Sequence, residues 1–161
     1  MGSDQRSKEN ACLEPVFPIP VSLPAASRQA IVIDTNIILD IFVFADATAR
    51  LVKQALDADE LDWIATVPMR SELARVLGYP QIVPRLVFYQ LSASSVLASF
   101  DRHVRLVEVA AKACLTCRDP DDQKFIDLAI ATKALLLSKD QHVLSMSKRL
   151  LAHGVRAVRA I

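Results

Sequence analysis

The feature that most restricts the fold is a short apolar run that ends in a polar tripeptide. Residues 30–33 have the sequence Ala-Ile-Val-Ile, and Asp34, Thr35 and Asn36 follow directly. A strand that is apolar on both faces is typical of the interior of a parallel sheet, which helices cover on each side. The run therefore predicts a buried parallel strand and places Asp34 at its carboxyl end.

Strand-like runs alternate with helical patterns along most of the chain. Further strands are predicted at Trp63–Val67, Val107–Val109, Ala134–Leu137 and Val155–Val158. Helices are predicted at residues 37–44, 47–58, 69–77, 80–91, 93–104, 120–133 and 142–152. This alternation indicates an α/β fold with a mainly parallel sheet. In such sheets, ligands bind beyond the carboxyl ends of the strands.

The first 28 residues differ from the rest. Prolines at positions 15, 18, 20 and 24 exclude a helix there and favour an extended arm, and the Met-Gly-Ser start is typical of an expression remnant. We expect a proline-rich extension over residues 1–28 and one domain over residues 29–161. Two hypotheses for the extension stay open: it packs on the domain or on a partner subunit, or it is a linker.

Cysteine usage and hydropathy bear on the compartment. The chain has 3 cysteines, an odd number with no signal peptide before them, which favours a reducing cytoplasm. Cys114 and Cys117 form a single CxxC motif, and the two further ligands that a zinc site needs are not apparent nearby. No apolar run approaches the roughly 20 residues that span a bilayer, so no membrane partner is expected.

Acidic side chains recur where predicted strands end and helices begin. These acids are Asp34, Glu72, Asp119, Asp121, Asp122 and Asp140. Two carboxylates about 4 Å apart repel by about 4 kcal/mol at an effective dielectric near 20, so a cluster of them favours a divalent cation. Oxygen ligands favour magnesium or manganese over zinc. Such an ion can activate water and stabilise the charge that develops on a phosphodiester.

Each acid also has a structural explanation. Asp119 is a natural N-cap for a helix that begins at Pro120, and Asp122 stands where a capping-box acid would reach back. Asp121 suits the helix dipole, and Asp34 can cap the next helix. The metal hypothesis therefore depends on all the acids falling at matched strand–helix junctions.

The acids lie in segments that resemble the motifs of the PIN domain family. Residues 32–38 (VIDTNII) look like its opening motif, and residues 71–77 (SELARVL) look like its second, helical motif. Residues 117–125 (CRDPDDQKF) are similar to a signature of a bacterial toxin subgroup, and residues 138–140 resemble the last acidic motif. The resemblance covers roughly residues 29–158 and implies a PIN-like three-layer sandwich, with a central sheet flanked by helices.

The same resemblance implies a function. It implies an endoribonuclease that uses Mg²⁺ or Mn²⁺ to hydrolyse RNA, acting as the toxin of a toxin–antitoxin pair with an antitoxin protein as partner. By position, the catalytic acids are Asp34, Glu72, Asp122 and Asp140, the metal ligands are these four with Asp119, and the supporting polar groups are Asn36 and Ser138. The segment at residues 131–134 departs from the family pattern, which leaves open whether Asp119, Asp121 or Asp122 is the third acid.

Basic and apolar residues suggest further contacts. Arg118, Lys124 and Lys139 are close in sequence to the acids and are candidates for binding RNA phosphates, with Lys148 or Arg149 farther along the same surface. The alternative is that they are ordinary solvated charges. The stretch at residues 82–91 is apolar around much of its circumference and predicts a homodimer, unless that helix lies inside the core.

Three other function classes are weaker. A phosphatase of the haloacid-dehalogenase type needs a second Asp two positions after the first, where this chain has Asn36. A phospho-receiver domain needs an acidic pair that Asp34 does not have. A non-catalytic PIN-like domain that binds RNA or protein as a scaffold is the main alternative, and the presence of all four acids favours catalysis over it.

Overall fold

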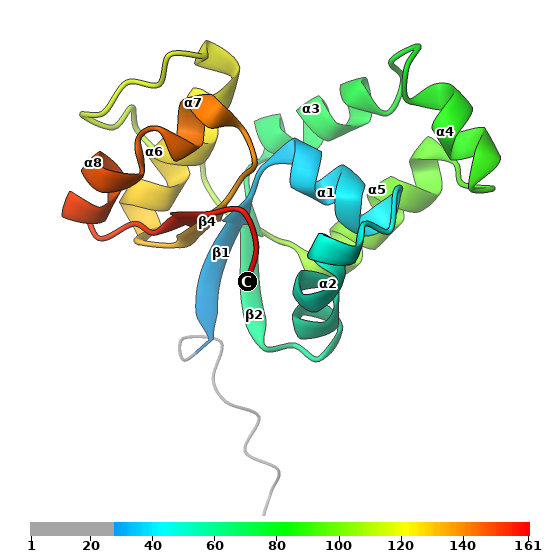
Figure 1. The fold of residues 1–161 in the computed structure, drawn as a ribbon, viewed down its shortest axis with the longest axis horizontal. Coiled ribbons are helices and arrows are strands. Elements are labelled where there is room, and N and C mark those ends of the chain that lie inside the picture. Colours follow the sequence, from blue (N-terminus) through cyan, green and yellow to red (C-terminus); the bar gives the residue numbers. More distant parts are fainter. Residues whose placement is uncertain (1–27) are drawn as a thin grey trace, which may run out of the picture.

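A parallel sheet forms the centre of the molecule (Figure 1). The structure is a computed structural model that describes residues 28–161, so the prediction for the proline-rich extension lies almost wholly outside the described residues. The sheet has five strands in the order β3-β2-β1-β4-β5, and every neighbouring pair is parallel. The strands are β1 (Gln29–Ile33), β2 (Leu61–Ala65), β3 (Arg105–Leu106), β4 (Leu135–Leu137) and β5 (Ala157–Val158).

Helices lie on both sides of this sheet (Figure 1). The first group is α1 (Thr35–Phe42), the 3₁₀ turn η2 (Ala47–Ala49) with α2 (Arg50–Asp57), α3 (Val67–Val76), α4 (Val83–Phe88) and α5 (Ala93–His103). The second group is the 3₁₀ turn η3 (Pro120–Asp122) with α6 (Gln123–Thr132), α7 (Gln141–Leu144) and α8 (Ser147–Ala152). The predicted three-layer α/β sandwich is therefore confirmed. Within the described part of the chain, no helix has the length and apolar character of a membrane span.

The predicted central strand is buried on both faces. Ile31 and Val32 are 0% exposed and Ile33 is 2% exposed, because α6 packs against β1 and further helices cover the other face. Strand order reverses beside β1, whose neighbours are β2 and the much later β4. Asp34 N donates a hydrogen bond of 2.9 Å to Leu137 O, which joins the carboxyl ends of β1 and β4. Such a topological switch point is where open α/β sheets bind their ligands.

Two strand boundaries differ from the prediction. The second strand covers Leu61–Ala65 rather than Trp63–Val67, because Val67 already begins α3 and Pro68 fits the first helical turn, where no N–H is needed. The third strand is Arg105–Leu106 rather than Val107–Val109. Arg105 holds it beside β2 through two hydrogen bonds to the Asp62 carboxylate, of 3.0 and 2.6 Å.

The predictions near the carboxyl end also need correction. The single helix predicted at residues 142–152 is two helices, α7 and α8, because the chain turns at Ser145 and Met146. Met146 has φ −90° and ψ 3° and is 1% exposed, so the turn buries a large apolar side chain that a continuous helix would place elsewhere. The last strand is Ala157–Val158 and shorter than the predicted Val155–Val158.

Candidate metal centre

Asp34 lies at the carboxyl end of β1 and is 3% exposed. Its Oδ2 accepts a hydrogen bond of 2.7 Å from the hydroxyl of Ser138, which is wholly buried. The same hydroxyl oxygen accepts a bond of 3.1 Å from Asp140 N. Asp34 stands at the N-cap position of α1. Ser138 thus links the acid that follows β1 to the acid that follows β4.

The surroundings of Asp34 disfavour its charge. Burial raises the pKa of this carboxyl, and the nearby charges of Glu72 and Asp140 raise it further. The Ser138 hydroxyl and the Asn36 backbone amide lower it only in part. A cation beside Asp34 would therefore stabilise the ionised form.

Three further acids lie together at the same edge of the sheet. One carboxylate oxygen from each of Asp119, Asp122 and Asp140 lies within 4.8 Å of the other two. Asp119 and Asp140 are also helix caps: Asp119 accepts a bond of 2.9 Å from Asp121 N, and Asp140 accepts one of 2.8 Å from His142 N. Capping and clustering therefore occur together, since the backbone bond to Oδ1 fixes where each carboxylate lies.

Asp122 is the most perturbed acid of the group. It is 7% exposed, makes no cap hydrogen bond, and its Oδ2 has no hydrogen-bond partner within residues 28–161. Burial is the main cause that raises its pKa to about 7, and the charges of Asp34, Asp140, Asp119 and Glu72 add to it. A buried carboxylate oxygen without a partner is costly unless a ligand satisfies it.

Glu72 approaches the centre from α3. Its carboxylate forms an ion pair with Lys124, whose ammonium also donates a bond of 2.5 Å to Asp121 O and lies 5.0 Å from the Phe125 ring centroid. The sequence predicts that Lys124 binds RNA phosphates, and in the structure its ammonium pairs with the carboxylate of Glu72. Its partner comes from a distant helix, which no local pattern in the sequence reveals.

The remaining predicted residues lie around this centre. Lys139 donates a bond of 2.7 Å to the buried Asp40, so it too is paired with an acid. Asn36, Asp121 and Arg118 are exposed, and Asp121 is not part of the carboxylate trio. The sequence interpretation missed Gln141 and His142, which line a pocket beside the centre. Their position directly after Asp140 was the only signal that could have found them.

The geometry fits a divalent cation bound by hard oxygen ligands. The trio supplies three carboxylates, Asp34 and Glu72 add two more nearby, and Asp122 Oδ2 is a buried oxygen without a partner. No nitrogen or sulfur ligand belongs to the trio, so the oxygen set favours Mg²⁺ or Mn²⁺.

Comparisons with known proteins agree with this architecture. Residues 30–142 match the sequence profile of the PIN domain family. The crystal structure of VapBC2 from Rickettsia felis, bound to a DNA fragment from its promoter, matches with a TM-score of 0.55 and 14% identity, covering 80% of this chain and 98% of that one. At this identity the likeness concerns the fold alone. No curated protein matches the sequence. Because the profile spans the matched strand–helix units from the central strand to Asp140, this chain belongs to the PIN domain family.

Proposed function

We propose that the protein is a metal-dependent endoribonuclease that hydrolyses phosphodiester bonds of RNA. The observation that carries this proposal is the partnerless, buried oxygen of Asp122 within a group of five acids. Asp119, Asp122 and Asp140 would hold Mg²⁺ or Mn²⁺, with Asp34 and Glu72 completing the site. The bound ion would lower the pKa of the attacking water and stabilise the negative charge on the phosphodiester in the transition state.

Other side chains of the protein would orient the acids and balance their negative charge. Ser138 Oγ fixes Asp34 Oδ2, and Asp140 N fixes Ser138 Oγ, so the acids after β1 and β4 keep one relative position. Lys124 balances the charge of Glu72, and we propose that it turns to an RNA phosphate once Glu72 gains another cation. Arg118 is exposed and is a second proposed contact to the RNA backbone. Lys139 is proposed to contact the same backbone at the edge of the site.

Cleavage of a single-stranded RNA tests this function. The wild-type protein should cleave with Mg²⁺ or Mn²⁺ and lose activity in excess EDTA. Asp122→Asn should abolish cleavage, whereas Asp121→Asn, a change of the same kind at the exposed neighbour, should retain most of it. Cleavage that is equal in EDTA would contradict a metal-dependent reaction. RNA binding without cleavage under any of these conditions would favour the non-catalytic scaffold instead.

The biological role proposed is that of a toxin with an antitoxin partner. It is supported by family membership and by the fold likeness to VapBC2. We also propose a homodimer through α4. The sequence predicts that the apolar residues at positions 82–91 do not all lie inside the core, and the exposed fractions of their side chains agree with this. Val87 and Phe88 are 71% and 79% exposed, whereas only Ile82 and Leu86 are buried. Induced expression should arrest growth, and the Asp122→Asn variant should relieve the arrest.

A further inference from the structure

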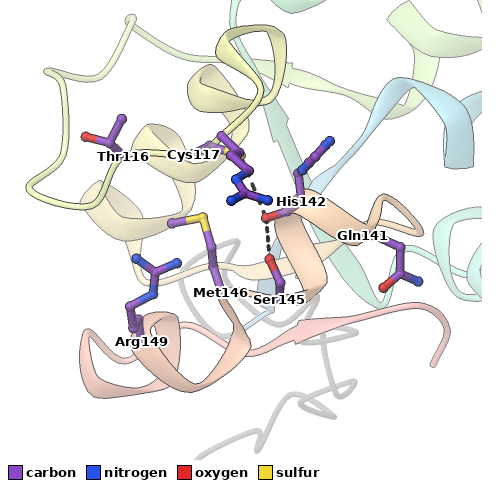
Figure 2. Close-up of a pocket in the computed structure, with 8 residues that line it drawn as sticks. Thr116, Cys117, Gln141, His142, Ser145, Met146 and Arg149 are labelled. Atoms are coloured by element: carbon purple, nitrogen blue, oxygen red, sulfur yellow. Dashed lines mark hydrogen bonds between the residues drawn. The ribbon is translucent and has the colours of Figure 1, made fainter.

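A pocket of about 750 Å³ opens beside the acidic centre (Figure 2). Its walls come from three segments: the chain before η3, α7 with the turn that follows it, and α8. Figure 2 shows Met146 and Arg149 on the opposite wall from Thr116 and Cys117. The residues on which the argument depends are Cys117, Arg118, Gln141, His142, Met146 and Arg149.

The charge of this pocket is opposite to that of the neighbouring centre. Arg118 and Arg149 supply two guanidinium groups, and His142 supplies an imidazole, while none of the residues that line the pocket is acidic. A guanidinium is planar and binds phosphate oxygens through two parallel hydrogen bonds. The pocket therefore suits an anion such as a phosphate group, whereas the acidic trio suits a cation.

The two sites share a wall. Arg118 immediately precedes Asp119, and Gln141 immediately follows Asp140. Two residues of the pocket are therefore sequence neighbours of acids in the trio. Cys117 Sγ donates to His142 O over 3.8 Å, which closes the wall between the segment before η3 and α7. Burial raises the pKa of the Cys117 thiol, and the charges of Asp122, Asp119 and Asp140 raise it further, as expected for a group beside the trio.

The pocket is lined by polar and apolar side chains together, and His142 carries its one aromatic ring. Met146 and Cys117 are 1% and 5% exposed, and the His142 ring lies at the rim. Unpaired bases of single-stranded RNA are bound by apolar and aromatic surfaces and by guanidinium planes. The volume falls within the range of pockets that enclose one small organic ligand. A duplex keeps its bases stacked inside, so it cannot place one here.

We propose that this pocket binds the nucleotide next to the scissile phosphodiester, with Arg118 and Arg149 on its phosphate and its base against the exposed His142 ring. The proposal rests on the proposed ribonuclease function. It adds that α7 and α8 carry a nucleotide-binding subsite apart from the acids. Arg149 is thus a binding residue that no acid motif reveals.

Binding in EDTA tests the pocket without cleavage. We would measure fluorescence anisotropy of a labelled single-stranded RNA with wild type, Arg149→Gln and Lys148→Gln. Lys148 is a matched control, since it is exposed, precedes Arg149 on α8 and lines a different hollow with Arg156. A hydrogen bond to a charged group contributes about 1.5–3 kcal/mol, so Arg149→Gln should weaken binding by about tenfold or more, and Lys148→Gln by about twofold.

Competition separates a nucleotide from a bare phosphate. Adenosine 5′-monophosphate should displace the labelled RNA at lower concentration than ribose 5-phosphate. Arg149→Gln should weaken both competitors and keep this difference, because Arg149 contacts the phosphate that both compounds share. Equal competition by the two compounds would overturn the nucleotide assignment. If Arg149→Gln and Lys148→Gln lose RNA affinity equally, the loss comes from the lower positive charge of the protein and not from the pocket. That result would also overturn the nucleotide assignment. If Arg149→Gln binds RNA normally but no longer binds an acidic protein partner, the pocket is a binding site for that partner instead.

Cleavage by the loaded enzyme then separates the two proposals. Arg149→Gln should raise KM for RNA and leave the rate at saturating RNA within about threefold of wild type. Asp122→Asn should abolish cleavage and keep RNA affinity in EDTA. If the wild type binds RNA through Arg149 but never cleaves it, the ribonuclease proposal fails and the pocket stands. If the wild type cleaves and Arg149→Gln matches it in both KM and affinity, only the pocket proposal fails.

Discussion

Replacing Asp122 with asparagine should stabilise the metal-free protein at neutral and alkaline pH. The pKa of Asp122 rises from an ordinary 3.8 to about 7 in the folded state, so the folded protein holds a proton that the unfolded chain releases. Between those two pH values, folded-state stability therefore falls as pH rises. At 1.36 kcal/mol per pH unit, the loss amounts to at most about 4 kcal/mol. The asparagine side chain carries no charge at any of these pH values, so the variant avoids this loss.

Urea unfolding in EDTA, followed by circular dichroism from pH 4 to pH 8, measures this effect. Asp122→Asn should match wild type within about 1 kcal/mol near pH 4, where the carboxyl is protonated in the folded protein and about half protonated in the unfolded chain. At pH 8 the variant should exceed wild type by about 2–4 kcal/mol. Asp121→Asn changes an exposed acid at the preceding position and keeps Asp122, so its difference in stability from wild type should stay nearly constant with pH. A difference that stays constant with pH, or a less stable variant at pH 8, would refute the reasoning.

Excess metal should offset most of this difference in stability. An ion that binds the folded state at a hundred times its Kd adds about 2.7 kcal/mol to the free energy of unfolding. Wild type should gain this amount in Mg²⁺ or Mn²⁺, and Asp122→Asn should gain much less, because it lacks one carboxylate of the trio. Equal gains in both proteins would show that the ion binds elsewhere.

Three further changes test the centre, the core and the proposed interface. In EDTA, Asp34→Asn should melt at or above the wild-type temperature, because it removes a disfavoured charge; a clear drop would mark Asp34 as structural. Phe100→Ala should cost about 3–5 kcal/mol in urea unfolding, since Phe100 is 0% exposed and its ring lies 5.1 Å from that of Trp63; a loss under 1 kcal/mol would contradict that packing. Phe88→Ser should turn a dimer into a monomer by light scattering, with unchanged mass as the contrary result.

Local patterns predicted the layers of the fold well and the strand boundaries less well. The run at residues 30–33 is apolar on both faces, so its burial follows from the sequence alone. The start of β2 does not, because it contains Asp62, a residue that strands disfavour. Asp62 is stabilised there by Arg105, which lies 43 positions away and whose pairing no local pattern contains. The break between α7 and α8 likewise follows from the burial of Met146 rather than from any Gly or Pro.

The candidate site shows the same division. Sequence placed the acids at strand–helix junctions, and the structure brings them to one edge because β1 and β4 are neighbours. Whether each acid caps a helix or belongs to a carboxylate cluster was left open, and the structure gives different answers. Asp119 and Asp140 cap a helical turn and also belong to the trio, whereas Asp122 belongs to the trio and makes no cap bond. The pairing of Lys124 with Glu72 depends on how α3 and α6 pack, which is a property of the whole fold.

The hydrogen bond between Asp34 and Ser138 joins residues 104 positions apart, and this separation has a consequence for synthesis in the cell. A growing chain that has not reached Leu135 can pair β1 only with β2, and it lacks both Ser138 and Asp140. Contacts of such long range form late and slowly. Ribosomes that stall or release early would therefore produce inactive fragments. Under the proposed ribonuclease function, this delay would protect the translation machinery from the unfinished product.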